Sequence, residues 1–267
     1  MKVGRRALRT HRYDGDVIFS CRDADGVIDV VDEIAVRSLQ FSSAARQSTM
    51  FRQEPNRLAL AYTQCMMTCL LFGDAPERVL MLGLGGGSLV KFLLDQCSDC
   101  RVDAVEKRPK IVEVAREYFH LPQDQRLSVH VEDALQFLEA PRTDPYDLIA
   151  VDLHDSHGMA PVVQRKEFFP CCHNWLAADG MLVINLWYGS NESEERMVRD
   201  NLVEVFKGRV LYLPVAGKRN CIALIFGTSR DLDVAAARAR ARQWQQRTQI
   251  DFPALLSEMR RFNPVFQ

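Results

Sequence analysis

Residues 79–94, VLMLGLGGGSLVKFLL, place four glycines between two apolar runs. The apolar runs predict a buried strand at 78–82 and a helix at 87–97, so the glycines form the bend that joins them. Glycine at such a bend permits positive φ and lets a ligand approach the backbone, because no Cβ stands in the way. The segment therefore predicts a ligand-binding loop, with a tight turn that binds nothing as the alternative. The glycines are Gly83, Gly85, Gly86 and Gly87.

Strand-like and helix-like segments continue to alternate after this bend. Several strand-like segments are nearly continuous apolar runs, as expected when helices cover both faces of a parallel sheet. The last two strands are joined only by VAGKRN, which is too short for a crossover helix, so we expect them to be antiparallel. The further predicted strands are 101–106, 127–131, 147–152, 181–187, 209–214 and 221–227, and the further predicted helices are 109–119, 133–139, 164–178 and 191–206.

This order of elements predicts an α/β fold. It is the layout of a class I methyltransferase-type Rossmann fold, with a seven-stranded, mostly parallel sheet whose last strand is antiparallel. Before it, residues 17–41 predict short strands with Asp25-Gly26 as a hairpin turn, hence a small N-terminal antiparallel sheet. Residues 56–72 predict a helix, and two further helices close the tail. We therefore expect a small β-strand domain at 1–55 and a Rossmann-like domain at 56–267.

Charge and composition exclude several classes of function. The chain has 34 Lys and Arg against 35 Asp and Glu, so no electrostatic reason exists to expect nucleic acid or an anionic membrane as partner. No apolar run reaches the roughly 18–20 residues of a membrane span, and the basic start lacks the apolar core of a secretory signal. We therefore expect a cytoplasmic protein.

The eight cysteines raise the alternative of a metal site. Cys97 and Cys100 form a CxxC, but no second pair completes a four-ligand zinc set. Most of the others lie in apolar segments, for example Cys65 and Cys69 one helical turn apart. We expect the cysteines to be small buried hydrophobic residues in a reducing compartment, and we expect no metal cofactor.

Acidic residues follow the second and third strands of the predicted sheet. Glu106 ends the second strand, where a carboxylate can accept both hydroxyls of a ribose. Asp133 follows the third strand, where an acid and the neighbouring amide at Ala134 can hydrogen-bond an adenine, and it also suits a helix N-cap. NAD carries the same ribose, but the third glycine of its GxGxxG fingerprint falls on Ser88. The pattern therefore favours an S-adenosyl ligand, bound by domain 56–267.

The most polar cluster follows the fourth predicted strand, in YDLIAVDLHDSHGM. It contains Asp152, His154, Asp155 and His157 at the sheet edge where open α/β folds bind ligands. An amine has a pKa of about 10 and is protonated in water at neutral pH, so a carboxylate can both bind the cation and accept its proton. A DxxD pair at this position predicts amine chemistry. A metal site from two Asp and two His, or plain loop polarity, are the alternatives.

Several of these segments together resemble the spermidine synthase (polyamine aminopropyltransferase) family. They are VLMLGLGGGSL, VDAVEKRPKIVEVAREYF, VHVEDALQFL, YDLIAVDLHDSHGM and EFFPCCHNWLAADGMLVINL. The resemblance spans residues 15–228 and so includes the small N-terminal sheet. It implies transfer of an aminopropyl group from decarboxylated S-adenosylmethionine to a polyamine such as putrescine, with release of methylthioadenosine, in a homodimer.

The resemblance also implies roles for individual residues. Glu106 matches the acid that holds the ribose of the donor, and Asp133 matches the acid that contacts adenine. Asp152 and Asp155 match the DxxD loop, with Asp155 as the base and amine anchor. The resulting candidate set is catalytic Asp155 and Asp152, donor-binding Gly83, Gly85, Gly86, Gly87, Glu106, Asp133, Ala134 and Asp152, and amine-binding Tyr62, Asp155 and His154.

Several positions depart from the family pattern. Gly86 stands where the family's GGGDGG loop carries an acid, and DLHDS replaces DSSDP. Thr63 follows Tyr62 where the family has Gln, and Ala216 lies at or near the place of a tyrosine. The donor half of the site thus matches the family, and the amine half resembles its divergent spermidine-synthase-like branch.

Two alternatives follow from these departures. One is a methyltransferase that uses intact S-adenosylmethionine, because a glycine loop without its acid repels the methionine carboxylate less. The other is a binding protein that senses an adenosyl metabolite, whose signature would be a complete pocket with unreactive acids.

Overall fold

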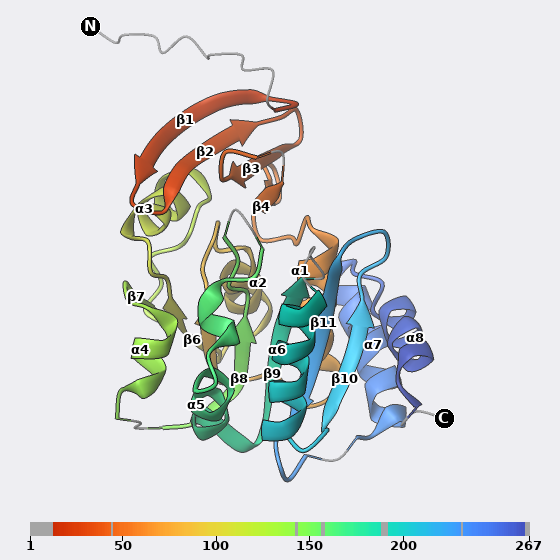
Figure 1. The fold of residues 1–267 in the computed structure, drawn as a ribbon. Coiled ribbons are helices and arrows are strands. Elements are labelled where there is room, and N and C mark those ends of the chain that lie inside the picture. Colours follow the sequence, from red (N-terminus) through yellow and green to blue (C-terminus); the bar gives the residue numbers. More distant parts are fainter. Residues whose placement is uncertain are drawn as a thin grey trace, which may run out of the picture.

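The computed structural model contains two sheets (Figure 1). It describes residues 13–43, 45–141, 144–155, 158–187, 192–230 and 232–264. In the larger sheet, β8 (Tyr146–Val151) and β9 (Leu176–Trp187) point toward the smaller one, so the carboxyl edge of the large sheet faces the small sheet. Within the described ranges, no helix has the length and apolar character needed to cross a membrane.

The large sheet is mostly parallel. Besides β8 and β9 it contains β5 (Arg78–Leu82), β6 (Arg101–Val105), β7 (Leu127–His130), β10 (Val210–Pro214) and β11 (Asn220–Phe226). The strand order is β10-β11-β9-β8-β5-β6-β7, and β11 is antiparallel to both of its neighbours. The predicted fold class is therefore confirmed, including the antiparallel last strand.

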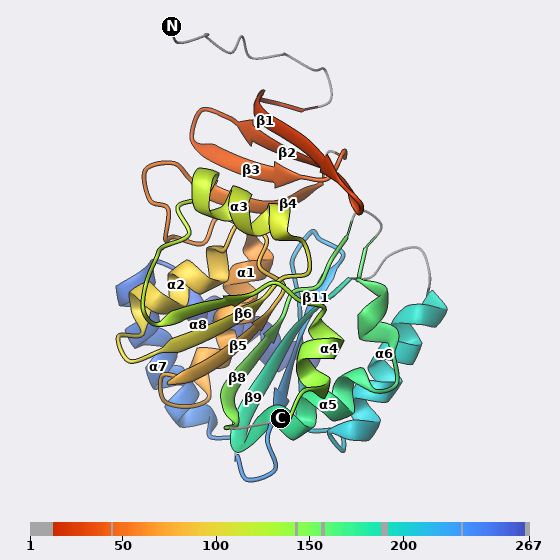
Figure 2. The same ribbon diagram turned by 90° about the vertical axis from the view of Figure 1, so that its left-hand side faces the viewer.

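Two groups of helices cover this sheet (Figure 2). One face carries α1 (Ala61–Met66), the 3-10 helix η1 (Met67–Leu71), α2 (Ser88–Gln96), α7 (Val234–Thr248) and α8 (Phe252–Phe262). The other carries α4 (Ala134–Glu139), the 3-10 helix η2 (Pro161–Gln164), α5 (Phe168–Trp175) and α6 (Glu192–Val205). Each face has its own apolar core, which explains why the central strands are apolar on both sides.

The cysteines are all free, and most of them are buried in these cores. Burial raises the pKa of the Cys97 thiol to about 11 and that of Cys100 to about 12. Buried thiols that stay protonated at neutral pH behave as small apolar side chains. The prediction that the cysteines act as small hydrophobic residues is therefore confirmed for the buried ones.

The small sheet consists of β1 (Asp16–Asp23), β2 (Gly26–Asp32), β3 (Val36–Gln40) and β4 (Arg46–Phe51), paired antiparallel in that order. It packs on α3 (Pro109–Tyr118) through a third core, in which Leu39 and Met50 meet Phe119. Lys91 of α2 is buried below this core and donates to the Phe119 carbonyl at 2.6 Å. The sheet is thus anchored to the large sheet through α3 and α2.

The structure corrects two predictions in the N-terminal part. The strand β4 was not predicted, and the helix predicted at 56–72 begins only at Ala61 and tightens into a 3-10 helix at Met67. Leu58 instead forms a β-bridge with Met50, which holds the chain extended before the helix.

A third correction concerns the helix predicted at 164–178. Here α5 ends at Trp175, because Leu176 already pairs with Tyr146 as the first residue of β9. The remaining predicted strands and helices are confirmed to within a few residues at their ends.

Candidate active site

The glycine bend closes the carboxyl end of β5. Gly83, Gly85 and Gly87 adopt φ values of 92°, 53° and 70°, in the region that favours glycine. At Gly83 a Cβ would lie only 2.4 Å from the carbonyl oxygen of Asp152. The absence of a side chain therefore lets the bend lie directly against the acidic loop that follows β8.

Glu106 lies directly after β6, and two backbone amides hold its carboxylate. The Leu84 amide donates to Oε2 at 3.1 Å and the Arg108 amide to Oε1 at 3.0 Å. Burial raises the pKa of Glu106, although the two amides act in the opposite direction. Each oxygen keeps a further lone pair, so the carboxylate can accept two ligand hydroxyls beside the glycine bend.

Asp133 follows β7 and caps α4. Its Oδ1 accepts from the amides of Leu135 at 2.9 Å and Gln136 at 3.3 Å, so the predicted N-cap is confirmed. The amide of Glu132 donates to the carbonyl of Glu106 at 3.2 Å, which ties the loops after β6 and β7 together. The acid and the neighbouring Ala134 thus lie at the same sheet edge as Glu106.

Asp152 follows β8 and accepts three side-chain contacts. Tyr62 donates to Oδ2 at 3.0 Å, Asn185 donates to Oδ1 at 2.9 Å, and Nδ1 of His154 lies 3.2 Å from Oδ1. Burial alone would raise the pKa of this carboxyl. The contacts from His154, Asn185 and Tyr62 outweigh burial and hold the pKa below its usual value. Asp152 is therefore ionised at neutral pH, in a fixed orientation.

Asp155 lies three residues further along the same loop. Its amide donates to the Gly158 carbonyl at 2.9 Å, and its Oδ1 accepts from the Gly158 amide at 3.1 Å, so Asp155 is bound to Gly158 at two points. Gln47 of β4 donates to the Asp155 carbonyl at 3.5 Å, so the small sheet reaches this loop. His157, predicted as part of the same cluster, lies outside the described residues.

The metal alternative for this loop includes His157 and is therefore not tested. Among the residues that the structure describes, no three His, Cys, Asp or Glu side chains are placed to hold an ion. His154 instead makes its contact with Asp152 and lies edge-on to Trp187, with ring centroids 6.5 Å apart. Among the described residues its buried Nε2 has no hydrogen-bond partner.

A pocket lies between the glycine bend, α1 and the small sheet. Asp152 is the charged residue in its wall, and Tyr62 stands beside it. Glu106, Asp133, His154 and Asp155 are not part of that wall, although Glu106 contacts it through the amide of Leu84. The lining residues are Gln47, Ser48, Tyr62, Thr63, Met81, Leu84, Gly85, Ser88, Leu89, Val90 and Asp152.

Gly86 is packed too closely for a side chain. A Cβ there would lie 2.8 Å from Ser48 Oγ and 2.9 Å from Cδ1 of Phe119. Phe119 is fully buried, and Ser48 Oγ lies 3.3 Å from the hydroxyl of Ser88. The hydroxyl and the ring thus occupy the space that an acidic side chain at position 86 would need.

Three residues of the site were not predicted from the sequence. Gln47 and Ser48 belong to β4, which carries no clear strand pattern. Asn185 is a single polar residue in the apolar run MLVINLW at the end of β9, and it is 3% exposed. A buried amide near the carboxyl end of a central strand is a signal that could have identified Asn185.

The sequence of this chain is similar to those of known proteins from one family. The family model described as "Spermine/spermidine synthase domain" matches residues 59–207, more than half of the chain. The chain is 31% identical over 240 residues to a polyamine aminopropyltransferase from Neisseria meningitidis, which covers 89% of this chain and 90% of the relative.

Two further similarities concern the fold and a different activity. A spermidine synthase from Thermotoga maritima superimposes with a TM-score of 0.69 at 16% identity, covering 91% of this chain and 84% of that one, which supports the fold alone. An eEF1A lysine and N-terminal methyltransferase from Xenopus laevis is 32% identical over 156 residues, which are 52% of this chain but only 22% of the relative.

Proposed function

Since the chain belongs to the spermine/spermidine synthase family, we propose that it is a polyamine aminopropyltransferase that uses decarboxylated S-adenosylmethionine as donor. One observation carries the proposal beyond family membership. The glycine bend, which binds Glu106 through the Leu84 amide, shares a pocket wall with Tyr62 and Asp152. An acid suited to a cation therefore lies in the pocket wall, and an acid suited to a ribose lies behind that wall, hydrogen-bonded to Leu84.

In this proposal the donor lies along the carboxyl edge of β5, β6 and β7. Glu106 accepts the two ribose hydroxyls while the backbone amides fix its own orientation. Asp133 and the amide of Ala134 bind the adenine. The glycines at 83, 85, 86 and 87 let the backbone lie against the nucleoside and the aminopropyl chain.

The acceptor amine reacts at the aminopropyl carbon next to the sulfonium. A C–N bond forms at that carbon as the C–S bond breaks, and its electron pair returns to sulfur, which leaves as neutral methylthioadenosine. Asp155 anchors the amine and accepts its proton, assisted by the ionised Asp152 with Tyr62 and His154 beside it. Because the sulfonium is already an activated leaving group, positioning supplies most of the acceleration.

Parallel titration calorimetry with S-adenosylmethionine, its decarboxylated form and methylthioadenosine tests the proposal. We expect the decarboxylated donor to bind more tightly than the intact one, and putrescine to yield methylthioadenosine. The Asp155→Asn variant should bind methylthioadenosine normally but form little product. Donor binding without product from any diamine would instead indicate a binding protein.

A methyltransferase is the second candidate, and the packing at Gly86 favours it. An acid cannot be accommodated at this position without displacing Ser48 or Phe119, so the loop does not repel a methionine carboxylate there. Part of the chain is also similar to a methyltransferase. Tighter binding of intact S-adenosylmethionine in the same calorimetric series would favour methyl transfer.

We also infer a homodimer and a cytoplasmic location. The dimer rests on the family resemblance, and the location rests on cysteines that are free and mostly buried. The same proposal assigns residues 1–55 to a small domain and 56–267 to the catalytic domain. Light scattering on the purified full chain tests the dimer directly.

A further inference from the structure

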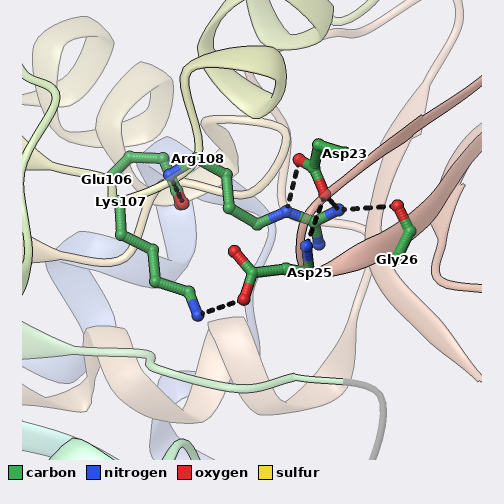
Figure 3. A network of polar contacts seen from close by, with 6 residues as sticks. All are labelled: Asp23, Asp25, Gly26, Glu106, Lys107 and Arg108. Carbon is green, nitrogen blue, oxygen red and sulfur yellow. Dashed lines mark hydrogen bonds and ion pairs between the residues drawn. The ribbon is translucent and has the colours of Figure 1, made fainter.

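The tip of the small sheet is bound to the loop that carries Glu106 (Figure 3). The turn between β1 and β2 runs from Asp23 to Gly26, where φ is 120°. Within this turn the Asp25 amide donates to Asp23 Oδ1 at 3.0 Å, which fixes the orientation of the Asp23 carboxylate. The turn therefore presents an oriented acid to the neighbouring loop.

Arg108 receives this acid in a two-point contact. Its Nε donates to Asp23 Oδ2 at 3.0 Å and an NH2 group donates to Oδ1 at 2.8 Å, while the same NH2 group lies 3.4 Å from the Gly26 carbonyl. The guanidinium also stacks on the ring of Phe41 at 4.6 Å, and Arg108 is only 6% exposed. A buried two-point contact of this kind defines position and angle together.

The backbone of Arg108 makes a second contact, with Glu106. Its amide donates to Glu106 Oε1 at 3.0 Å, so one residue connects the small sheet with the acid assigned to the ribose. Arg108 is also the N-cap of α3, and Pro109 follows it, which restricts its backbone to extended conformations. The side chain that binds Asp23 and the amide that binds Glu106 therefore belong to one residue with few alternative backbone conformations.

We propose that Asp23 is a positioning residue for ribose recognition, acting through Arg108 on the orientation of Glu106. The inference rests on the proposed function, in which Glu106 binds the two ribose hydroxyls. The small sheet then contributes to donor binding although Asp23 itself touches no donor atom. Loss of the Asp23 carboxylate should weaken binding of the ribose hydroxyls selectively.

A second ion pair in the same turn supplies a matched control. Lys107 donates to Asp25 at 2.9 Å, but both side chains are about half exposed, and their contact does not involve the amide that holds Glu106. Exposed pairs contribute little because water screens them. Asp25→Asn therefore changes the same charge in the same turn without disturbing Arg108.

The experiment compares the full chain with its Asp23→Asn and Asp25→Asn variants by titration with 5′-methylthioadenosine and its 2′,3′-dideoxy analogue. We expect Asp23→Asn to lose about tenfold in affinity for methylthioadenosine and to leave the dideoxy analogue unchanged. In turnover assays, the donor KM should rise with little change in kcat. Asp25→Asn should alter neither ligand.

Equal losses for both ligands in Asp23→Asn would overturn the inference, because a general structural role weakens every contact alike. Equal effects of Asp23→Asn and Asp25→Asn would overturn it as well. If Asp23→Asn does not fold, Arg108→Lys keeps the charge and the amide but loses the two-point contact, and the same selectivity is expected. If the wild-type protein itself binds both ligands equally, Glu106 is not a ribose acid and that part of the proposed function fails.

Discussion

The two acids at the centre of the site are held in different ways. Glu106, which the proposed function assigns to the ribose, is fixed by two backbone amides, and burial raises its pKa. Asp152, which the proposed function assigns to the amine, is fixed by three side chains, and their contacts lower its pKa. A backbone amide is present whichever residue occupies a position, whereas a side-chain hydrogen-bond partner is lost when the residue changes. The orientation of Glu106 therefore does not depend on neighbouring side chains, whereas that of Asp152 depends on three of them.

The largest effect is expected for the Glu106→Gln variant. A carboxylate that accepts two hydroxyls contributes two charge-assisted hydrogen bonds, so we expect the donor KM to rise about a hundredfold with a much smaller change in kcat. Steady-state kinetics with varied donor measures the effect. The neighbouring exposed acid in Glu132→Gln serves as control, and an equal change there would assign the loss to overall charge.

Packing at Gly86 gives the next largest effect. Gly86→Ala brings a Cβ to 2.8 Å from Ser48 Oγ and 2.9 Å from Phe119, so we expect a loss of about 1–3 kcal/mol in the free energy of unfolding. Denaturant titration measures it. Adding Ser48→Ala removes one of the two close contacts and should restore part of the loss. Full tolerance of Gly86→Ala in the wild-type background would show that the loop can make room for an acid.

Tyr62→Phe tests the side-chain network of the amine half. The variant removes one hydrogen bond to Asp152, so we expect kcat to fall about tenfold. The pKa of Asp152 should also rise, and the acid limb of the pH–rate profile should move to higher pH. Tyr146→Phe is the matched control, because Tyr146 donates to Asp103 at 3.0 Å away from this network. Similar losses in both variants would contradict a local role for Tyr62.

The smallest expected effect concerns stability: the contributions of Glu106 and Asp152 to the free energy of unfolding should change with pH in opposite directions. The folded state binds the Glu106 proton more tightly than the unfolded chain does, so its contribution to stability falls as the pH rises above about 4.5. Asp152 has a lowered pKa, so its contribution is present above about 3.8 and is lost as the pH falls through the folded value.

Melting curves between about pH 3 and pH 7 measure this difference. The Tm advantage of the wild type over Glu106→Gln should shrink as the pH rises, whereas its advantage over Asp152→Asn should grow. Each change should amount to a few degrees. Parallel trends for the two variants would show that burial and hydrogen bonding do not separate the two acids.

Much of the fold could be predicted because the large sheet is covered on both faces. Strands such as Arg78–Leu82 and Tyr146–Val151 are then apolar runs that stand out in the sequence. The strand Arg46–Phe51 was missed because its buried positions include Ser48 and Thr49, whose polarity hides the pattern. Tertiary packing determines that such a segment becomes a strand, and its residues carry no local sequence pattern that indicates it.

The site also contains residues that could be predicted from the sequence and residues that could not. Glu106, Asp133 and Asp152 could be predicted because each follows a strand, and the carboxyl ends of neighbouring parallel strands meet at one edge. Gln47 reaches this edge from the small sheet and Asn185 from the end of a separate strand. The approach of Gln47 depends on how the two sheets face each other, and that of Asn185 depends on β9 lying beside β8 in the large sheet. Spacing along the chain encodes neither.

The side-chain amide of Asn185 is held in one orientation by a residue two hydrogen bonds away from Asp152. Asn220, the first residue of β11, donates to the Asn185 side-chain oxygen at 2.9 Å, which leaves the Asn185 NH2 group to face Asp152. Both amides are buried, so a reversed Asn185 would set oxygen against carboxylate and NH2 against NH2. Asn220 of β11 thus fixes which end of the Asn185 amide faces Asp152. Libraries designed to change the acceptor amine should therefore vary position 220 together with position 185.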